Sequence, residues 1–104
     1  MTMLINLPSI DYTALAAQAS VKLGETPFQL GGNALLYLTA PIGGAGVVTL
    51  EGSPDGTTWT SIRTLNAAQT ASRWVELTNL PKYIRTNVTT VGTGSAVPSL
   101  HGVQ

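Results

Sequence analysis

The stretch Gly46–Leu65, GVVTLEGSPDGTTWTSIRTL, decides the fold of this chain. Val48 and Leu50 share one face of the run Gly46–Ser53, which is the pattern of a strand with one buried side. The next residues, Ser53-Pro54-Asp55-Gly56, have turn chemistry: proline presets φ, aspartate tolerates the bridge region and glycine accepts positive φ. Thr57–Leu65 returns as the partner strand, so this stretch predicts an antiparallel hairpin.

Similar runs occur on both sides of this hairpin, separated by turn residues at short intervals. We expect strands at 21–23, 35–40, 73–77, 83–91 and 96–103, with Pro98 marking an edge strand. The glycine-rich segments 43–46 and 92–94 are interpreted as hairpin turns and 66–72 as a short loop. About seven strands spaced in this way are typical of an antiparallel β-sandwich or jelly roll. We therefore predict an all-β domain over residues 19–104.

Residues 1–18 differ from the rest of the chain. The segment is apolar, carries one charge at Asp11, and is interrupted by Pro8, which argues against a continuous central strand. It could be a first strand with a linker, or an N-terminal arm that docks on a neighbouring subunit. A segment this apolar should not stay in water, so it either adds to its own sandwich or docks on a neighbour. We predict the arm, because Pro8 argues against a central strand and the sandwich has enough expected strands without this segment. Its expected contact residues are Leu4, Ile5, Leu7, Ile10 and Tyr12.

Composition excludes several classes of function. The 104 residues suit one domain, and only 10% are charged, with five acids balancing five bases. Nucleic-acid binding needs a concentrated basic face, which five dispersed bases do not supply. No apolar run is long enough to span a membrane, and no secretory signal is recognisable. The absence of cysteine removes disulfides and thiolate chemistry.

The residues that could carry catalysis have simpler structural interpretations. His101 is the only histidine and has no recognisable nucleophile or orienting partner. Glu51 and Glu76 could form a glycosidase pair, but we expect both to point outward and to pair with arginines. Asp55 is the sole acid in its loop, so a turn role is favoured over calcium binding. We therefore predict no catalytic, metal or cofactor site, and no enzyme.

The aromatic residues are the remaining candidates for binding. Trp59, Trp74, Tyr37 and Tyr83 could form a platform on which a sugar stacks. We expect Trp59 to close the core over the hairpin instead. Trp74 is ambiguous, because Val75 and Leu77 on the other face are equally apolar. Trp74 and Tyr83 are thus the predicted ligand aromatics.

The stretch Leu50–Thr60, LEGSPDGTTWT, followed by KYIR at 82–85 and GTGS at 92–95, resembles small β-sandwich structural proteins of tailed bacteriophages. The resemblance covers roughly residues 46–103, and residues 1–45 carry no matching motif. It implies a role in the virion, as a capsid decoration (cement) protein or as a tail or baseplate component. It supplies no catalytic residues.

We therefore expect a capsid decoration protein that binds the major capsid protein as a homo-oligomer, with a trimer favoured. It would be made in the host cytoplasm and lie on the exterior of the capsid. The alternative is a tail or host-adhesion module that binds carbohydrate through Trp74 and Tyr83. Neither reading involves nucleic acid or a membrane.

Overall fold

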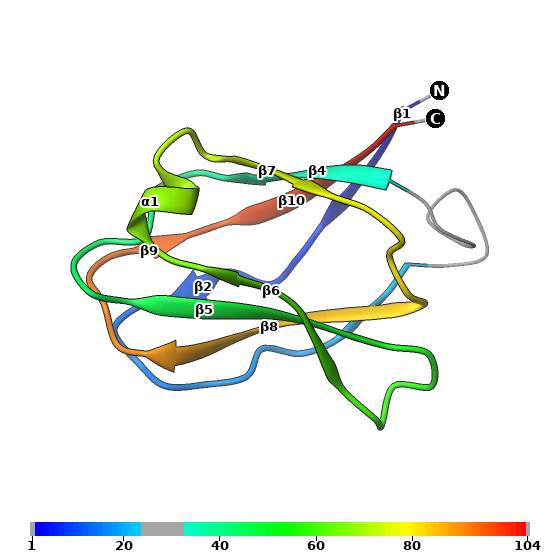
Figure 1. The fold of residues 1–104 in the computed structure, drawn as a ribbon, viewed down its shortest axis with the longest axis horizontal. Helices are drawn as coiled ribbons and strands as arrows, with labels where there is room; N and C mark the ends of the chain where they lie inside the picture. Colours follow the sequence, from blue (N-terminus) through cyan, green and yellow to red (C-terminus); the bar gives the residue numbers. More distant parts are fainter. Residues whose placement is uncertain (1, 24–32, 104) are drawn as a thin grey trace.

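The computed structural model describes residues 2–23 and 33–103, which form two stacked antiparallel sheets (Figure 1). The upper sheet of Figure 1 contains, in spatial order, β1 (Thr2–Asn6), β10 (Pro98–Val103), β4 (Asn33–Leu38) and β7 (Trp74–Leu77). The lower sheet contains β3 (Val21–Lys22), β8 (Tyr83–Thr90), β5 (Val47–Ser53) and β6 (Thr60–Leu65). A short ribbon pairs β2 (Ile10–Asp11) with β9 (Ser95–Ala96).

The predicted all-β antiparallel sandwich is confirmed, and so is the hairpin that defines it. β5 and β6 pair antiparallel, and Gly56 has a φ of 83° in the turn between them. The described chain has ten strands rather than about seven, because several short pairs are too brief to stand out in the sequence. Within residues 2–23 and 33–103, no helix has the length and apolar character needed to cross a membrane.

The core lies between the two sheets and is built by the period-two pattern of the long strands. Leu36 and Leu38 on β4 face Leu50 on β5 and Ile84 on β8, and all four are almost fully buried. Burying one such side chain contributes about 1.5–3 kcal/mol. The residues between them, such as Tyr37 and Arg85, consequently lie on the two outer faces.

The predicted separate arm over residues 1–18 was wrong. β1 pairs along its full length with β10, and residues 16–18 bond to β8, where the Gln18 amide donates to Thr86 O at 2.8 Å. Of the five expected contact residues, Leu7, Ile10 and Tyr12 are buried in this chain's own core, Ile5 packs against it, and only Leu4 is exposed. The physical reason is that Pro8 ends β1 but does not stop the chain from turning inward into β2.

Tyr12 shows how firmly this segment is built into the domain. Its side chain is 1% exposed, and its hydroxyl donates to the Ala40 carbonyl at 3.2 Å. Burial raises the pKa of Tyr12 to about 12, so the hydroxyl stays protonated and remains a donor.

The two glycine-rich segments are crossovers between sheets rather than hairpin turns. Residues 39–46 carry the chain from β4 in the upper sheet to β5 in the lower sheet, and 91–97 return it from β8 toward β10. The two crossovers pair with each other at Gly43 and Thr93. A side chain on Gly46 would come within 2.8 Å of Gly92 Cα, so this close approach requires glycine.

Two smaller expectations were also wrong. β10 lies between β1 and β4, so Pro98 does not mark an edge; it is the first residue of its strand, where a missing N–H is tolerated. The expected loop 66–72 contains a short helix, α1 (Ala67–Thr70). Asn66 caps this helix by accepting from the amides of Ala68 and Gln69, a local signal that the sequence does contain.

Candidate functional site

The outer face of the upper sheet carries two rows of side chains that cross all four strands. The strand registers place Leu4, His101, Leu35 and Glu76 in one row, and Asn6, Ser99, Tyr37 and Trp74 in the next. We call these eight residues the upper face. The rows exist because side chains at alternate positions of neighbouring strands point to the same side of a sheet.

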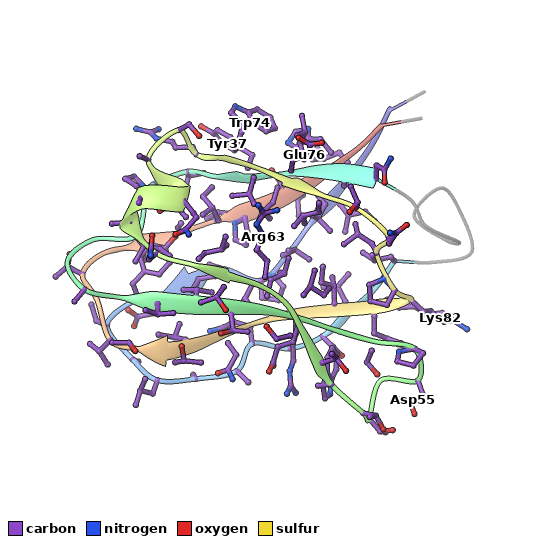
Figure 2. All side chains as sticks on the ribbon, in the orientation of Figure 1. Tyr37, Asp55, Arg63, Trp74, Glu76 and Lys82 are labelled. Atoms are coloured by element: carbon purple, nitrogen blue, oxygen red, sulfur yellow. The ribbon has the colours of Figure 1, made fainter. Side chains whose placement is uncertain are left out.

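Three aromatic rings meet on the upper face, from the neighbouring strands β10, β4 and β7. The Trp74 ring centroid lies 4.8 Å from that of Tyr37 and 5.1 Å from that of His101, in tilted and edge-on arrangements. Such geometries are the favoured ones for aromatic pairs and hold the rings in place. Tyr37 and Trp74 point away from the lower sheet, together with Glu76 (Figure 2).

The upper face combines exposed apolar groups with very little charge. Trp74 is 44% exposed and Leu4 58%, whereas Tyr37, Leu35 and His101 are partly buried beside them. Glu76 is the one acidic residue in the two rows, and Asn6 and Ser99 are neutral polar residues. An exposed tryptophan supported by other rings and edged by polar groups has the composition of a binding surface.

The two predicted ligand aromatics do not form one site. Trp74 lies on the upper face, whereas Tyr83 lies on β8, on the outer side of the lower sheet. Tyr83 is also covered by the β5–β6 turn, because a Cβ built on Gly56 would lie 3.6 Å from its ring. The prediction of a shared site was therefore wrong, and Tyr37 is the partner of Trp74 instead.

Trp59 does not close the core, which corrects a second expectation. The Arg85 guanidinium lies 4.2 Å above the centroid of the Trp59 ring, on the outer side of the lower sheet. Arg85 Nε also donates to Glu51 Oε1 at 2.8 Å, as expected for an outward-pointing glutamate. Trp59 is thus only partly buried, and its ring is stacked against a cation on the outer side of the lower sheet.

The groups that could carry catalysis do not assemble into a catalytic constellation. Ser99 Oγ and His101 Nε2 lie 3.0 Å apart, but among the described residues no carboxylate is hydrogen-bonded to the His101 ring to orient it. Glu51 and Glu76 belong to different sheets. In residues 2–23 and 33–103, no group of three or more His, Cys, Asp or Glu side chains is placed to hold a metal.

Asp55 has the turn role that the sequence predicted. Its carboxylate accepts from the amides of Thr57 and Thr58, both at 2.9 Å, and from the Ser53 hydroxyl at 2.8 Å. These hydrogen bonds, led by the one from Thr58, lower the pKa of Asp55. The carboxylate is therefore engaged by its own loop.

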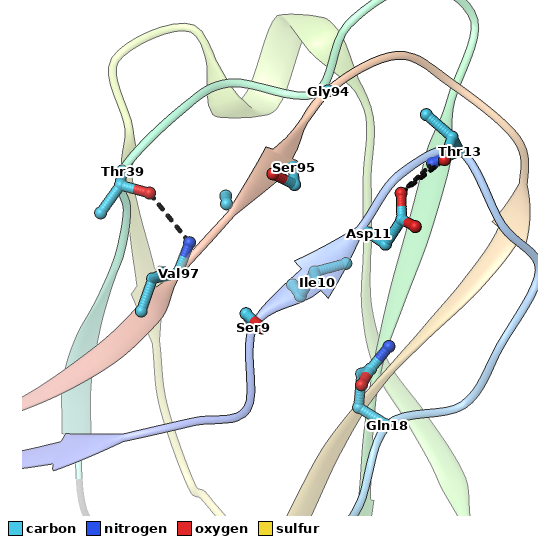
Figure 3. Close-up of a pocket in the computed structure, with 10 residues that line it drawn as sticks. Ser9, Ile10, Asp11, Thr13, Gln18, Thr39, Gly94, Ser95 and Val97 are labelled. Atoms are coloured by element: carbon cyan, nitrogen blue, oxygen red, sulfur yellow. Dashed lines mark hydrogen bonds between the residues drawn. The ribbon is translucent and has the colours of Figure 1, made fainter.

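A broad, open hollow of about 640 Å³ at one end of the sandwich is the second surface feature (Figure 3). It is lined by residues of β2 and β9 and of the neighbouring connections, including Thr39 after β4 and Val97 before β10, but several of its polar groups are already paired. Asp11 accepts from the Thr13 hydroxyl and amide, which lower its pKa, and Thr39 Oγ1 accepts from the Val97 amide at 2.8 Å. The hollow thus offers a ligand fewer free groups than its size suggests.

Sequence reasoning identified Trp74 but missed Leu35 and His101 as its neighbours. Leu35 and Tyr37 alternate with the buried Leu36 and Leu38, so period two alone could have placed them on one face. Their position beside His101 depends on pairing between β4 and β10, which are far apart in the chain. Comparison with protein families, curated proteins and solved structures finds no match for this chain.

Proposed function

We propose that this chain is a non-enzymatic structural protein of a bacteriophage virion, a capsid decoration (cement) protein that binds and stabilises the assembled head. The observation that carries the proposal is the upper face, a surface with little charge on which the exposed Trp74 of the edge strand β7 packs against Tyr37 and His101. The resemblance of 50–60, 82–85 and 92–95 to phage β-sandwich proteins supplies the virion context.

The upper face has the features that concentrate binding energy at protein interfaces. Tryptophan and tyrosine are the residues that most often contribute large shares of such energy, and they act best when a rim of weaker contacts excludes water. Tyr37 and His101 hold the Trp74 ring, so little rotamer freedom remains to be lost on binding. The low charge of the face keeps the cost of desolvation small.

The proposed mechanism is mass action. A protein that binds the assembled shell and not its separate subunits stabilises the shell. The partner is the major capsid protein, contacted on the exterior of the capsid after synthesis in the host cytoplasm. Leu7, Ile10 and Tyr12 are buried and cannot contact a capsid, so we assign the contact to the upper face instead of the expected arm. Leu4 is the one residue that is part of both. Many copies on one shell multiply a modest contact.

A second candidate function is a tail or host-adhesion module that binds carbohydrate. The pairing of Trp74 with Tyr37, beside the polar Ser99 and Glu76, favours it, because aromatic rings edged by hydrogen-bonding groups can stack against a sugar. In this case the platform contains Tyr37 and not Tyr83.

One pair of variants tests both functions. We expect wild-type protein to sediment with phage heads that lack it, and Trp74→Ala to bind those heads at least about 30-fold more weakly, as the loss of about 2 kcal/mol at an interface tryptophan implies. Trp59→Ala is the matched control, since Trp59 lies on the opposite outer face. Circular dichroism would verify that both variants fold.

Three results would count against the proposal. Equal binding of Trp74→Ala and wild type would remove the upper face from the contact. Weaker binding by Trp59→Ala alone would move the contact to the lower sheet. Sedimentation with host surface glycans and not with heads, lost in Trp74→Ala, would establish the adhesion module instead.

A further inference from the structure

β1 forms an edge of the upper sheet, and its outward backbone groups have no partner among residues 2–23 and 33–103. In the spatial order of the sheet, β1 has β10 on one side, and no other segment of the described chain pairs with it (Figure 1). An unpaired strand edge presents a row of N–H and C=O groups that can pair with another strand.

The register identifies which backbone groups point outward. The Leu7 amide donates to the Pro98 carbonyl at 3.1 Å, so Leu7 and Pro98 form a hydrogen-bonded pair. In an antiparallel ladder such pairs alternate, so Met3 and Ile5 also bond to β10. The N–H and C=O groups of Thr2, Leu4 and Asn6 consequently point away from β10, toward the open side of the sheet.

On the opposite edge of the same sheet, side chains donate hydrogen bonds to the outward carbonyls. Along β7 the outward carbonyls belong to Trp74 and Glu76. Arg63 Nη1 donates to Glu76 O at 2.6 Å, and Ser72 Oγ donates to Trp74 O at 3.4 Å. No such side-chain donor reaches the outward groups of β1 from the described residues. The outward carbonyls of β7 therefore accept hydrogen bonds from side chains, whereas those of β1 do not within the described residues.

The edges of the lower sheet are also irregular or charged. β6 contains Arg63 and shows a register shift opposite Leu50 and Glu51, and bulges and charges discourage strand addition. The other edge consists of β3 and the single bridge at Ala17, with an interruption between them. β1 has neither charge, nor proline, nor bulge over Thr2–Asn6. Among the edge strands of the described chain, β1 is the regular one without a charged residue.

We propose that β1 pairs antiparallel with β1 of a second copy of this chain, so that two upper sheets join into one continuous sheet across a twofold axis. Adding a strand to an exposed sheet edge is a common mode of association. The interface is isologous, because the same edge serves both copies. The proposal concerns self-association and stands independently of capsid binding.

The outward groups select one register for this pairing. Leu4 faces Leu4 of the second copy at the axis, and Thr2 faces Asn6 on each side of it. Each of these pairs exchanges both of its backbone hydrogen bonds, and no other register uses all the outward groups.

Two further observations fit a second copy as the occupant. Leu4 is 58% exposed on the upper face, and its meeting with Leu4 of the second copy at the axis covers this apolar side chain. The chain has five bases and five acids, so two copies approach without net repulsion. Pairing also makes the two upper faces contiguous, which would give the dimer a bivalent surface.

The first experiment measures mass and dissociation of the full chain by sedimentation equilibrium. We expect wild type to form a dimer. Leu4→Lys should raise the dimer dissociation constant at least tenfold, because it places like charges opposite each other at the axis. Leu15→Lys is the matched control: Leu15 is 63% exposed and lies outside β1, so this variant should dimerise like wild type.

The second experiment measures amide hydrogen exchange along β1. The amides of Leu4 and Asn6 should be protected at high protein concentration and should lose protection on dilution. The Leu7 amide, bonded within the chain, should stay protected at both concentrations. Leu4→Lys should lose the concentration-dependent protection at Asn6 while remaining folded.

A monomer or a trimer at all concentrations would overturn the proposal. So would a dimer in which Leu4 and Asn6 exchange as fast as exposed amides, because the contact would then lie elsewhere. Equal dimerisation by Leu4→Lys and wild type would have the same meaning. None of these readouts involves capsids, so they can fail while capsid binding holds.

Discussion

Truncation of Ile10 to alanine tests whether the N-terminal segment is part of the fold. Ile10 is 2% exposed and lies on β2, between the two sheets. It is part of the same core cluster as Leu36, Leu38 and Val48. If the segment were a dispensable arm, removing three carbons from Ile10 would leave stability unchanged.

The expected cost follows from burial. Replacing a fully buried isoleucine by alanine removes its transfer free energy and leaves a cavity, which together cost about 2–5 kcal/mol. Domains of this size have total stabilities of about 5–15 kcal/mol. At about 4–8 °C for each kcal/mol, the melting temperature should fall by roughly 8–40 °C.

The assay is thermal and urea unfolding followed by far-ultraviolet circular dichroism. Leu4→Ala is the matched control, because Leu4 lies in the same segment but is mostly exposed; it should change stability by less than about 0.5 kcal/mol at concentrations where the chain is monomeric. If Ile10→Ala melts within a few degrees of Leu4→Ala, the segment does not support the core and the structural assignment of residues 2–12 fails.

Two further predictions concern polar groups of the fold. The Thr86 hydroxyl is buried, has no hydrogen-bond partner among the described residues, and lines an apolar void with no room for water, so Thr86→Val should stabilise the protein by about 1–2 kcal/mol. The control is Thr70→Val, which should lower the free energy of unfolding in denaturant, because the buried Thr70 hydroxyl both donates and accepts a hydrogen bond. Stabilisation of both variants, or of neither, would contradict this reasoning. For Asp55, hydrogen bonds from the Thr58 and Thr57 amides lower its pKa from the usual 3.8, so the ionised carboxylate favours the folded state. Wild type should be more stable than Asp55→Ala at pH 7, and urea titrations should show the difference shrinking as pH falls below about 4; a difference that stays constant down to pH 2 would refute this assignment.

Part of the candidate site was predictable from the sequence. Trp74 was identified as a possible exposed aromatic, and the alternation of Leu35 and Tyr37 with buried leucines was visible. The error was to group Trp74 with Tyr83, because a linear sequence does not say which sheet each strand joins. The chain passes between the two sheets after β7, so residues nine positions apart point out of opposite sides of the molecule.

The same ambiguity explains the misplacement of Trp59. It follows a hairpin turn beside alternating residues, and an inward position was reasonable on hydrophobicity alone. The position of Arg85 on the neighbouring part of the sheet provides an alternative surface for the ring. That neighbour is 26 residues away in the chain and could be recognised only once β8 was known to pair with β5.

The sequence by itself determined the class of fold, the β5–β6 hairpin and most of the long strands, because alternation and turn chemistry are local properties. The tertiary structure decided the role of the N-terminal segment, the crossover paths of the glycine-rich loops and the composition of the upper face. These depend on pairs such as Leu4 with His101, which join the two ends of the chain. Alternation shows which residues of a strand share a face. Only the pairing of strands and the packing of the two sheets decide which strands are neighbours and which face remains exposed for binding.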